Sequence, residues 1–166
     1  MTKQNSPAKA GSRRISNKER EKIKKGQIIA VSISKEKGVK KNNVRLATLK
    51  EDFGIIGDAH AGTKNRQVSL LAIESIKKMR EKGLQVGPGD FAENITTEGF
   101  DLLGLKLGDR FRIGKDVRLQ ISQIGKVCHS RCHIYYQAGD CVMPKEGIFA
   151  SVVKGGRIKV GDSISV

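Results

Sequence analysis

One short segment of the sequence concentrates the side chains best suited to chemistry. Three cysteines and two histidines lie within fourteen residues, at Cys128, His129, Cys132, His133 and Cys141. Thiolates and imidazoles suit zinc, copper, iron–sulfur clusters or molybdenum. The segment therefore predicts a metal site or a reactive thiol, with Cys128 as the first candidate and Cys132, His133 and Cys141 as secondary metal ligands.

The spacing of these residues leaves three interpretations open. A C-x3-C pair followed by a lone cysteine lacks the paired C-x2-C knuckles of common structural zinc sites, so zinc remains an alternative without a specific signal. Lys126, His129 and Arg131 surround Cys128 in the sequence, and positive neighbours favour the reactive thiolate. The third interpretation is three inert, buried cysteines, because cysteine is among the most buried residue types.

A second candidate set is rich in glycine. It contains Gly57, Asp58, His60 and Gly62 and is followed by Arg66. Glycines let the backbone approach a ligand closely, and turn amides can cradle an anion. Arg66 is suited to a bidentate contact with phosphate, and His60 to a role as ligand or hydrogen-bond donor. The alternative is a surface turn in which Asp58 caps the backbone.

A third candidate set lies in the segment Pro88–Ile95. Glu93 and Asn94 stand there beside the apolar residues Phe91 and Ile95. Buried polar groups need partners. We therefore expect Glu93 and Asn94 either to fix the loop or to orient a bound ligand.

The elements that must position these sets are mostly short strands. A helix is expected over 72–82, where Ile73, Ile76 and Met79 repeat at spacing three and Gly83 follows. Frequent glycine turns between apolar runs indicate a mainly β fold, a barrel or sandwich with a few helices at most. Strands are predicted at 28–33, 44–49, 68–71, 110–113, 117–124, 147–153 and 157–166.

Composition and charge place the protein among basic, water-soluble domains. The 166 residues carry a formal net charge of +15, and residues 1–25 alone hold nine Lys or Arg and two Glu. This polar segment cannot bury enough apolar surface to order itself, so we expect a disordered basic tail over 1–25 and one domain over 26–166. No signal peptide or membrane span is indicated, so we expect a cytoplasmic protein. Its basic tail suits non-specific anions, including nucleic acid.

The ordered motifs together resemble those of the MOSC family, named for the C-terminal domain of molybdenum cofactor sulfurase. Order and spacing agree over about residues 27–166. The matching segments are Gly54–Gly62, Arg66–Leu71, Pro88–Ile95, Leu107–Arg110, Gly125–Cys128, Gly147–Ala150, Gly155–Gly156 and Val160–Asp162.

The resemblance implies a barrel of the pyruvate kinase β-barrel-like type and a role in sulfur or molybdenum cofactor chemistry. It implies that Cys128 is catalytic, as a sulfur carrier or a molybdenum ligand. It also implies that the cofactor is molybdopterin-like and is bound by Gly57, Asp58, His60, Gly62, Arg66, Glu93 and Asn94. The expected partners are cofactor assembly proteins or a cysteine desulfurase, and pyridoxal phosphate binding is associated with the family as a whole.

The segment near Cys128 departs from the commonest family pattern. Many members have Pro-Cys, whereas this chain has Val127-Cys128 and adds Cys132 and Cys141. The departure resembles a subgroup associated with cofactor assembly, which favours cofactor sulfuration or delivery. A molybdenum-dependent reductase of N-hydroxylated compounds stays an alternative, as do a zinc-stabilised domain and a nucleic-acid-binding module. Few aromatic residues are available to stack on bases, which weighs against the last.

Overall fold

The structure of the chain is a computed structural model. It describes residues 17, 24–126, 134, 138–139 and 141–166. Most of the expected tail over 1–25 falls outside this range, as do Cys128, His129, Cys132 and His133. None of the helices in the described part is long and apolar enough to cross a bilayer.

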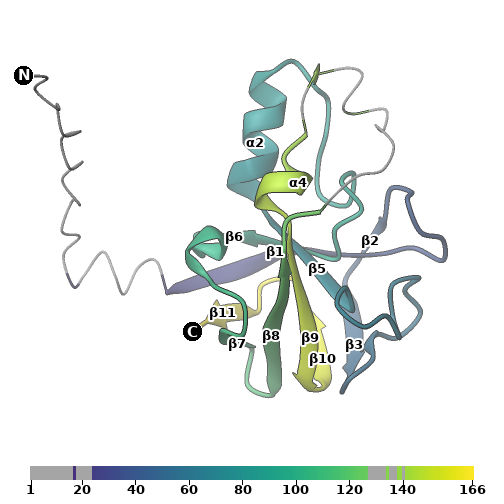
Figure 1. The fold of residues 1–166 in the computed structure, drawn as a ribbon, viewed down its shortest axis with the longest axis vertical. Coiled ribbons are helices and arrows are strands. Elements are labelled where there is room, and N and C mark those ends of the chain that lie inside the picture. Colours follow the sequence, from purple (N-terminus) through teal and green to yellow (C-terminus); the bar gives the residue numbers. More distant parts are fainter. Residues whose placement is uncertain (1–16, 18–23, 127–133, 135–137, 140) are drawn as a thin grey trace, which may run out of the picture.

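Strands make up most of the described chain (Figure 1). The helical elements of the described part are α2 (Ile73–Glu81), the short 3-10 helix η1 (Leu102–Gly104) and α4 (Met143–Glu146). The strands are β1 (Lys25–Ile33), β2 (Asn42–Val44), β3 (Leu46–Lys50), β4 (Gly54–Ile55), β5 (Val68–Ala72), β6 (Ile95–Glu98), β7 (Arg110–Ile113), β8 (Val117–Ile124), β9 (Ile148–Lys154), β10 (Gly156–Lys159) and β11 (Ser163–Ser165).

Seven of these strands close into a barrel. They follow the order β11-β7-β8-β9-β5-β6-β1, and β1 also pairs with β11. Strand β2 is added to the outside of β1, and a separate sheet has the order β10-β3-β4. The prediction of a mainly β, barrel-like fold is therefore confirmed.

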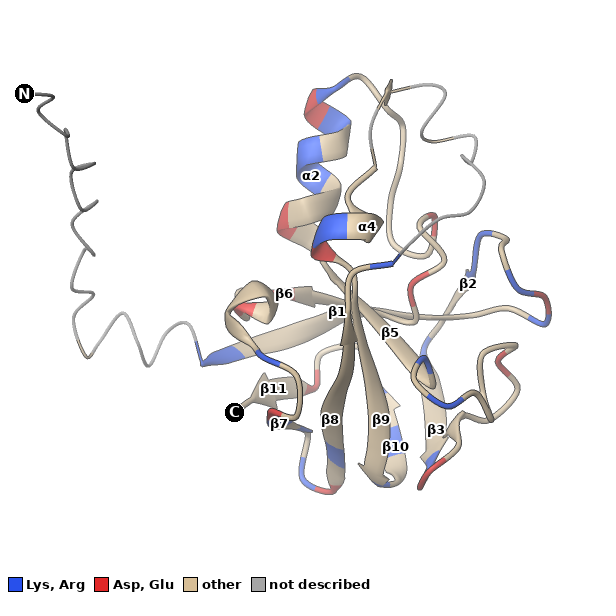
Figure 2. Ribbon diagram, in the orientation of Figure 1, with Lys and Arg blue, Asp and Glu red and all other residues tan. Residues whose placement is uncertain are grey.

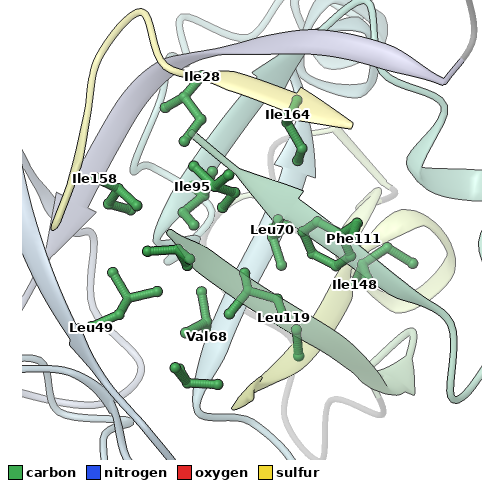
Figure 3. Close-up of a cluster of buried hydrophobic side chains, with 14 of the residues drawn as sticks. Ile28, Leu49, Val68, Leu70, Ile95, Phe111, Leu119, Ile148, Ile158 and Ile164 are labelled. Atoms are coloured by element: carbon green, nitrogen blue, oxygen red, sulfur yellow. The ribbon is translucent and has the colours of Figure 1, made fainter. Parts of the chain in front are cut away.

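The barrel closes around aliphatic side chains because its strands alternate in polarity. Along β7 and the first part of β8, buried residues alternate with more exposed ones, as expected for strands with one face on a core. Figure 3 shows Leu70, Ile95, Leu119 and Ile148 converging inside the barrel. The small sheet adds Leu49 and Ile158 to the same core, so one apolar cluster holds both sheets together.

Helix α2 connects the parallel strands β5 and β6 and builds a second core. Parallel neighbours need such a crossover, whereas antiparallel ones can be joined by tight turns. As the spacing predicted, Ile73, Ile76 and Met79 are buried. They pack in a cluster that also contains Cys141, and α2 and α4 lie together at one end of the barrel (Figure 1).

Several details of the secondary-structure prediction were wrong. The predicted strand 44–49 is two strands, β2 and β3, and the predicted strand 157–166 is β10 and β11 with a turn between them. Helix α4 lies between the predicted strands 117–124 and 147–153 and was not predicted. Strand β6 was missed because its sequence, ITTE, does not alternate. Thr96 and Thr97 are both buried, since this strand is covered on both sides.

Candidate functional site

The loop with the sequence Gly57–Gly62 is organised by the carboxylate of Asp58. Its Oδ1 accepts hydrogen bonds from the backbone N–H of Ser34 at 3.1 Å and from Nζ of Lys41 at 2.7 Å. Its Oδ2 accepts from the backbone N–H of His60 at 3.0 Å. Asp58 therefore ties its own loop to the hairpin between β1 and β2, because Ser34 follows β1 and Lys41 precedes β2.

The partner of Asp58 is a lysine that is fully enclosed. The side chains of Lys41 and Asp58 both have a relative exposure of 0%. Nζ of Lys41 also lies 2.9 Å from Oγ of Ser34 and 3.2 Å from Nδ1 of His60. A buried charge is tolerated when it is paired and hydrogen-bonded, and here three polar atoms surround the ammonium group.

The charge state of Asp58 follows from these contacts. Burial by itself raises the pKa of a carboxyl group, since it disfavours the charged form. The favourable interactions of the carboxylate with His60, Lys41 and Ser34 outweigh that effect and hold the pKa of Asp58 well below its usual range. Asp58 is therefore an ionised structural anchor at neutral pH, and its carboxylate caps the backbone N–H groups of Ser34 and His60 in a buried loop.

A second loop, Pro88–Ile95, is organised by Glu93. The Glu93 carboxylate is 0% exposed. It accepts from the backbone N–H of Gly89 at 2.6 Å and of Phe91 at 3.1 Å, and from Oγ1 of Thr96 at 3.0 Å. Burial raises the pKa of Glu93 despite these hydrogen bonds. The contacts show Glu93 fixing the loop, whereas its predicted part in cofactor binding stays a prediction.

Gly89 joins the two loops. Its carbonyl accepts from the backbone N–H of Lys41 at 2.9 Å. It has φ +90°, and a Cβ at this position would collide with the carbonyl oxygen of Lys41. Only glycine permits both the left-handed backbone and this close approach. Glu93 thus supports Lys41 through Gly89, and the two glycine-containing motifs form one polar cluster.

Asn94 extends this cluster into the barrel. Its side-chain amide donates to the carbonyl of Ser32 on β1 at 3.0 Å, and its Oδ1 accepts from the backbone N–H of Ser69 on β5 at 3.0 Å. Asn94 is 0% exposed. It therefore bridges two barrel strands where β6 begins, which explains why a polar residue occupies a fully buried position.

Arg66 lies beside the end of β8. Its Nε donates to Oε1 of Gln123 at 3.2 Å, and its guanidinium lies over the ring of Phe149 at 5.4 Å from the centroid. None of the described residues accepts a hydrogen bond from its two terminal nitrogens. Gln123 in turn donates to the carbonyl of Gly125 at 2.9 Å. Arg66 is thus held close to the chain that leads into Cys128.

The cysteine-rich segment itself is described only at its edges. Cys128, His129, Cys132 and His133 lie outside the described residues, and their predicted roles stay predictions. Cys141 is buried at 8% exposure among apolar side chains. No group of three or more His, Cys, Asp or Glu residues that could hold a metal ion lies in the described part.

Sequence reasoning missed Lys41 and Ser34. Lys41 stands in the charged run Lys35–Asn43, and such a run predicts solvent exposure. No local signal distinguishes it from Lys40, whose side chain is 64% exposed. The difference comes from Asp58, seventeen residues further on, and only the fold brings the two together.

The fold and these loops define a small closed β-barrel domain with a buried polar cluster, and with an arginine held at the end of β8, the strand that precedes the cysteine-rich segment. The family described as the MOSC domain matches residues 57–165, so the chain belongs to the MOSC domain family. This confirms the resemblance and makes the protein a molybdenum-cofactor-related domain. The matched range contains Asp58, His60, Arg66 and Glu93 as well as Cys128.

Solved structures share the fold. The YuaD protein from Bacillus subtilis is 19% identical with a TM-score of 0.71, and the alignment covers 84% of this chain and 94% of that one. YiiM from Geobacillus stearothermophilus is 19% identical with a TM-score of 0.63, covering 84% and 74%. YiiM from Escherichia coli is 22% identical with a TM-score of 0.60, covering 85% and 68%. No curated relative matches the sequence.

Proposed function

We propose that this chain binds a molybdopterin-type cofactor beside Arg66 and the Gly57–Gly62 loop and acts on it through Cys128. The observation that carries the proposal is the membership of the MOSC domain family, whose match spans all three features. The favoured task is cofactor sulfuration, delivery or assembly, because the sequence around Cys128 carries extra cysteines.

The available donors fit an anionic cofactor. A molybdopterin carries a phosphate, and the planar guanidinium of an arginine matches phosphate oxygens. Arg66 is fixed by Gln123 and Phe149, while its terminal nitrogens have no acceptor among the described residues. The Asp58 carboxylate, which would repel a phosphate, is already neutralised by Lys41. Arg66 therefore offers hydrogen-bond donors, and the Asp58 loop carries little unbalanced negative charge.

Cys128 supplies the reactive group in this proposal. Its thiolate is a soft ligand of the kind that binds molybdenum, and alternatively it carries a sulfur atom as a persulfide. When bound, the cofactor would supply a redox-active molybdenum that can accept sulfur. Lys126, two residues before Cys128, adds a positive charge that favours the thiolate.

The remaining parts of the chain have supporting roles. Glu93 and Asn94 hold the second loop and, through Gly89, the position of Lys41. The proposal also assigns the basic residues 1–25 to non-specific contacts with anions, next to a domain over 26–166. The expected partners are cofactor assembly proteins or a cysteine desulfurase in the cytoplasm, where thiols stay reduced. Figure 2 shows that Lys and Arg also occur on α2, α4 and several strands.

Retention of cofactor tests the proposal. The full chain is produced in a host that makes molybdopterin and is purified without oxygen, and its molybdenum and fluorescent pterin are measured. We expect both in the wild type, less metal in Cys128→Ala and less pterin in Arg66→Ala. Arg118→Ala is the matched control, because Arg118 lies on β8 and its side chain, among the described residues, donates hydrogen bonds only to the carbonyls of Lys115 and Val117.

The outcomes separate the alternatives. Equal retention by the wild type and Cys128→Ala would remove the ligand role of Cys128. Equal loss in Arg66→Ala and Arg118→Ala would remove the specific phosphate contact. Stoichiometric zinc without pterin, together with unfolding on chelation, would favour a zinc-stabilised domain instead.

A further inference from the structure

The ammonium group of Lys41 has a complete set of acceptors. A lysine ammonium carries three N–H donors and no lone pair. Its three neighbours are Oδ1 of Asp58 at 2.7 Å, Oγ of Ser34 at 2.9 Å and Nδ1 of His60 at 3.2 Å. The Ser34 hydroxyl donates its own proton to the carbonyl of Glu36 at 2.8 Å. Ser34 therefore turns a lone pair toward Lys41, and two of the three donors are assigned without ambiguity.

The third donor decides the protonation of the His60 ring. Because Lys41 cannot accept a hydrogen bond, its contact with Nδ1 requires a lone pair on that nitrogen. A proton on Nδ1 would instead point at the ammonium group. The other candidate for such a proton, Oδ2 of Asp58, lies 3.7 Å from Nδ1, beyond hydrogen-bond distance. That oxygen already accepts from the backbone N–H of His60 at 3.0 Å.

We propose that Lys41 is a positioning residue that fixes His60 as the neutral tautomer with its proton on Nε2, so that the ring presents a hydrogen-bond donor to an anionic oxygen of the bound ligand. The identity of that ligand rests on the function proposed above, whereas the tautomer does not. Nε2 makes no hydrogen bond to any described residue, and the His60 side chain is 17% exposed. No described residue therefore occupies this donor.

This assignment chooses between the two roles predicted for His60. A histidine binds a metal through a ring nitrogen that has a lone pair. In His60 the one lone pair, on Nδ1, is taken by Lys41, and Nε2 carries the proton. His60 therefore does not ligate a metal and does not act as a base through Nε2. It serves as a neutral donor to an oxyanion such as phosphate or molybdate.

The arrangement also sets the electrostatics around the ring. Lys41 and Asp58 form a buried pair with no net charge, so the cluster attracts an anion through the directed N–H dipole of His60. The lysine polarises the imidazole through Nδ1, which strengthens the donor at Nε2. The same logic applies to metal-binding histidines, in which the hydrogen bond at one nitrogen determines the state of the other.

Long-range hydrogen–nitrogen NMR spectra of the ¹⁵N-labelled full chain without cofactor test the tautomer. The chain has three histidines, and His60→Gln identifies the signals of His60. At neutral pH we expect a protonated Nε2 and an unprotonated, hydrogen-bonded Nδ1, with no detectable Nδ1–H form. A ring with its proton on Nδ1, or a mixture of both tautomers in the wild type, would overturn the proposal.

The role of Lys41 is tested by comparing two neighbouring lysines. Lys41→Met removes the donor to Nδ1, and the preference for the Nε2–H form should fall by about tenfold, as expected for a charge-assisted hydrogen bond. Lys40→Met is the matched control and should leave the ring unchanged. If Lys41→Met does not fold, the wild-type spectrum still decides the tautomer. An unchanged preference in folded Lys41→Met would overturn the positioning role.

The ligand-binding part has its own readout. Inorganic phosphate and, separately, molybdate are added to the wild type while the His60 signals are followed. We expect the Nε2–H resonance to shift and saturate while Nδ1 stays unprotonated. No shift at Nε2 would overturn the donor role even if the tautomer is as described. Because these spectra need no bound cofactor, a failure here differs from a failure to retain molybdenum and pterin.

Discussion

The barrel interior and the polar cluster are stabilised by different kinds of interaction. The interior contains aliphatic side chains such as Leu119 and Ile148, both at 0% exposure, and their packing is non-directional. The polar cluster contains Lys41, Asp58 and Glu93, each buried and each held by specific donors or acceptors. Apolar packing tolerates substitutions of similar volume, whereas a buried charge needs its own partner. We therefore expect the two regions to fail in different ways.

Removing one member of the buried ion pair should have the largest effect. Asp58→Ala leaves the enclosed Lys41 ammonium without its counter-charge, and breaking a buried pair costs about 3–5 kcal/mol of the free energy of unfolding. Denaturation in urea measures the loss. The exposed Asp116→Ala is the control and should stay within about 0.5 kcal/mol of the wild type. A small loss in Asp58→Ala would show that water reaches Lys41.

A cavity in the barrel should lower the free energy of unfolding somewhat less than loss of the ion pair, and it should leave the tautomer of His60 unchanged. Leu119→Ala removes a fully buried side chain from the main core, for which about 2–5 kcal/mol is expected. The exposed Leu103→Ala, at 52% exposure, should be nearly neutral. The folded Leu119→Ala protein should give wild-type His60 signals, and altered signals would show that the two regions are coupled.

Gly89 tests the contact between the two loops. Gly89→Ala places a Cβ against the carbonyl of Lys41 in addition to straining a backbone with φ +90°. Gly83 has φ +91° with nothing within 4 Å of its added Cβ, so Gly83→Ala reports the backbone strain alone. We expect Gly83→Ala to lower the free energy of unfolding by about 1 kcal/mol and Gly89→Ala to lower it further. Urea or thermal unfolding measures both changes. Equal losses would mean that the loops do not need this close approach.

The smallest expected effect is a pH dependence of the free energy of unfolding that comes from the polar cluster and not from the barrel interior. Because the pKa of Asp58 is held below its ordinary value of 3.8, its contribution to stability is present above that pH and is lost as the pH falls toward the lower, folded-state pKa. One group changes the slope by at most about 1.4 kcal/mol per pH unit. The double variant Lys41→Met with Asp58→Asn should lack this part of the acid loss in urea titrations. Identical slopes in both proteins would contradict the assignment.

The barrel could be predicted from the sequence because its signals are local. Residues 117–124 alternate, and the predicted strand matches β8 from end to end. The helix was also predicted closely, since Ile76 and Met79 repeat along one face. Strand β6 could not be predicted from alternation, because the consecutive residues Thr96 and Thr97 are both buried.

The candidate site was predictable only in part. The glycine pattern around Asp58 and the position of Arg66 indicated a ligand-binding loop, and the structure brings Asp58 and His60 together. It does not describe Cys128. The role of Lys41 could not be predicted, because its partner Asp58 is remote in sequence and the charged run around Lys41 predicts solvent exposure. The sequence therefore offered candidates for the chemistry, but it did not indicate the residues that hold those candidates in place.

The most direct test of the central claim is the molybdenum and pterin content of the wild-type chain after anaerobic purification from a host that makes molybdopterin. Cofactor binding predicts that both are retained in equal amounts and that pterin is displaced when the protein is unfolded. A folded, monodisperse protein that carries neither, and that takes up neither when supplied with molybdopterin, would contradict the proposed function.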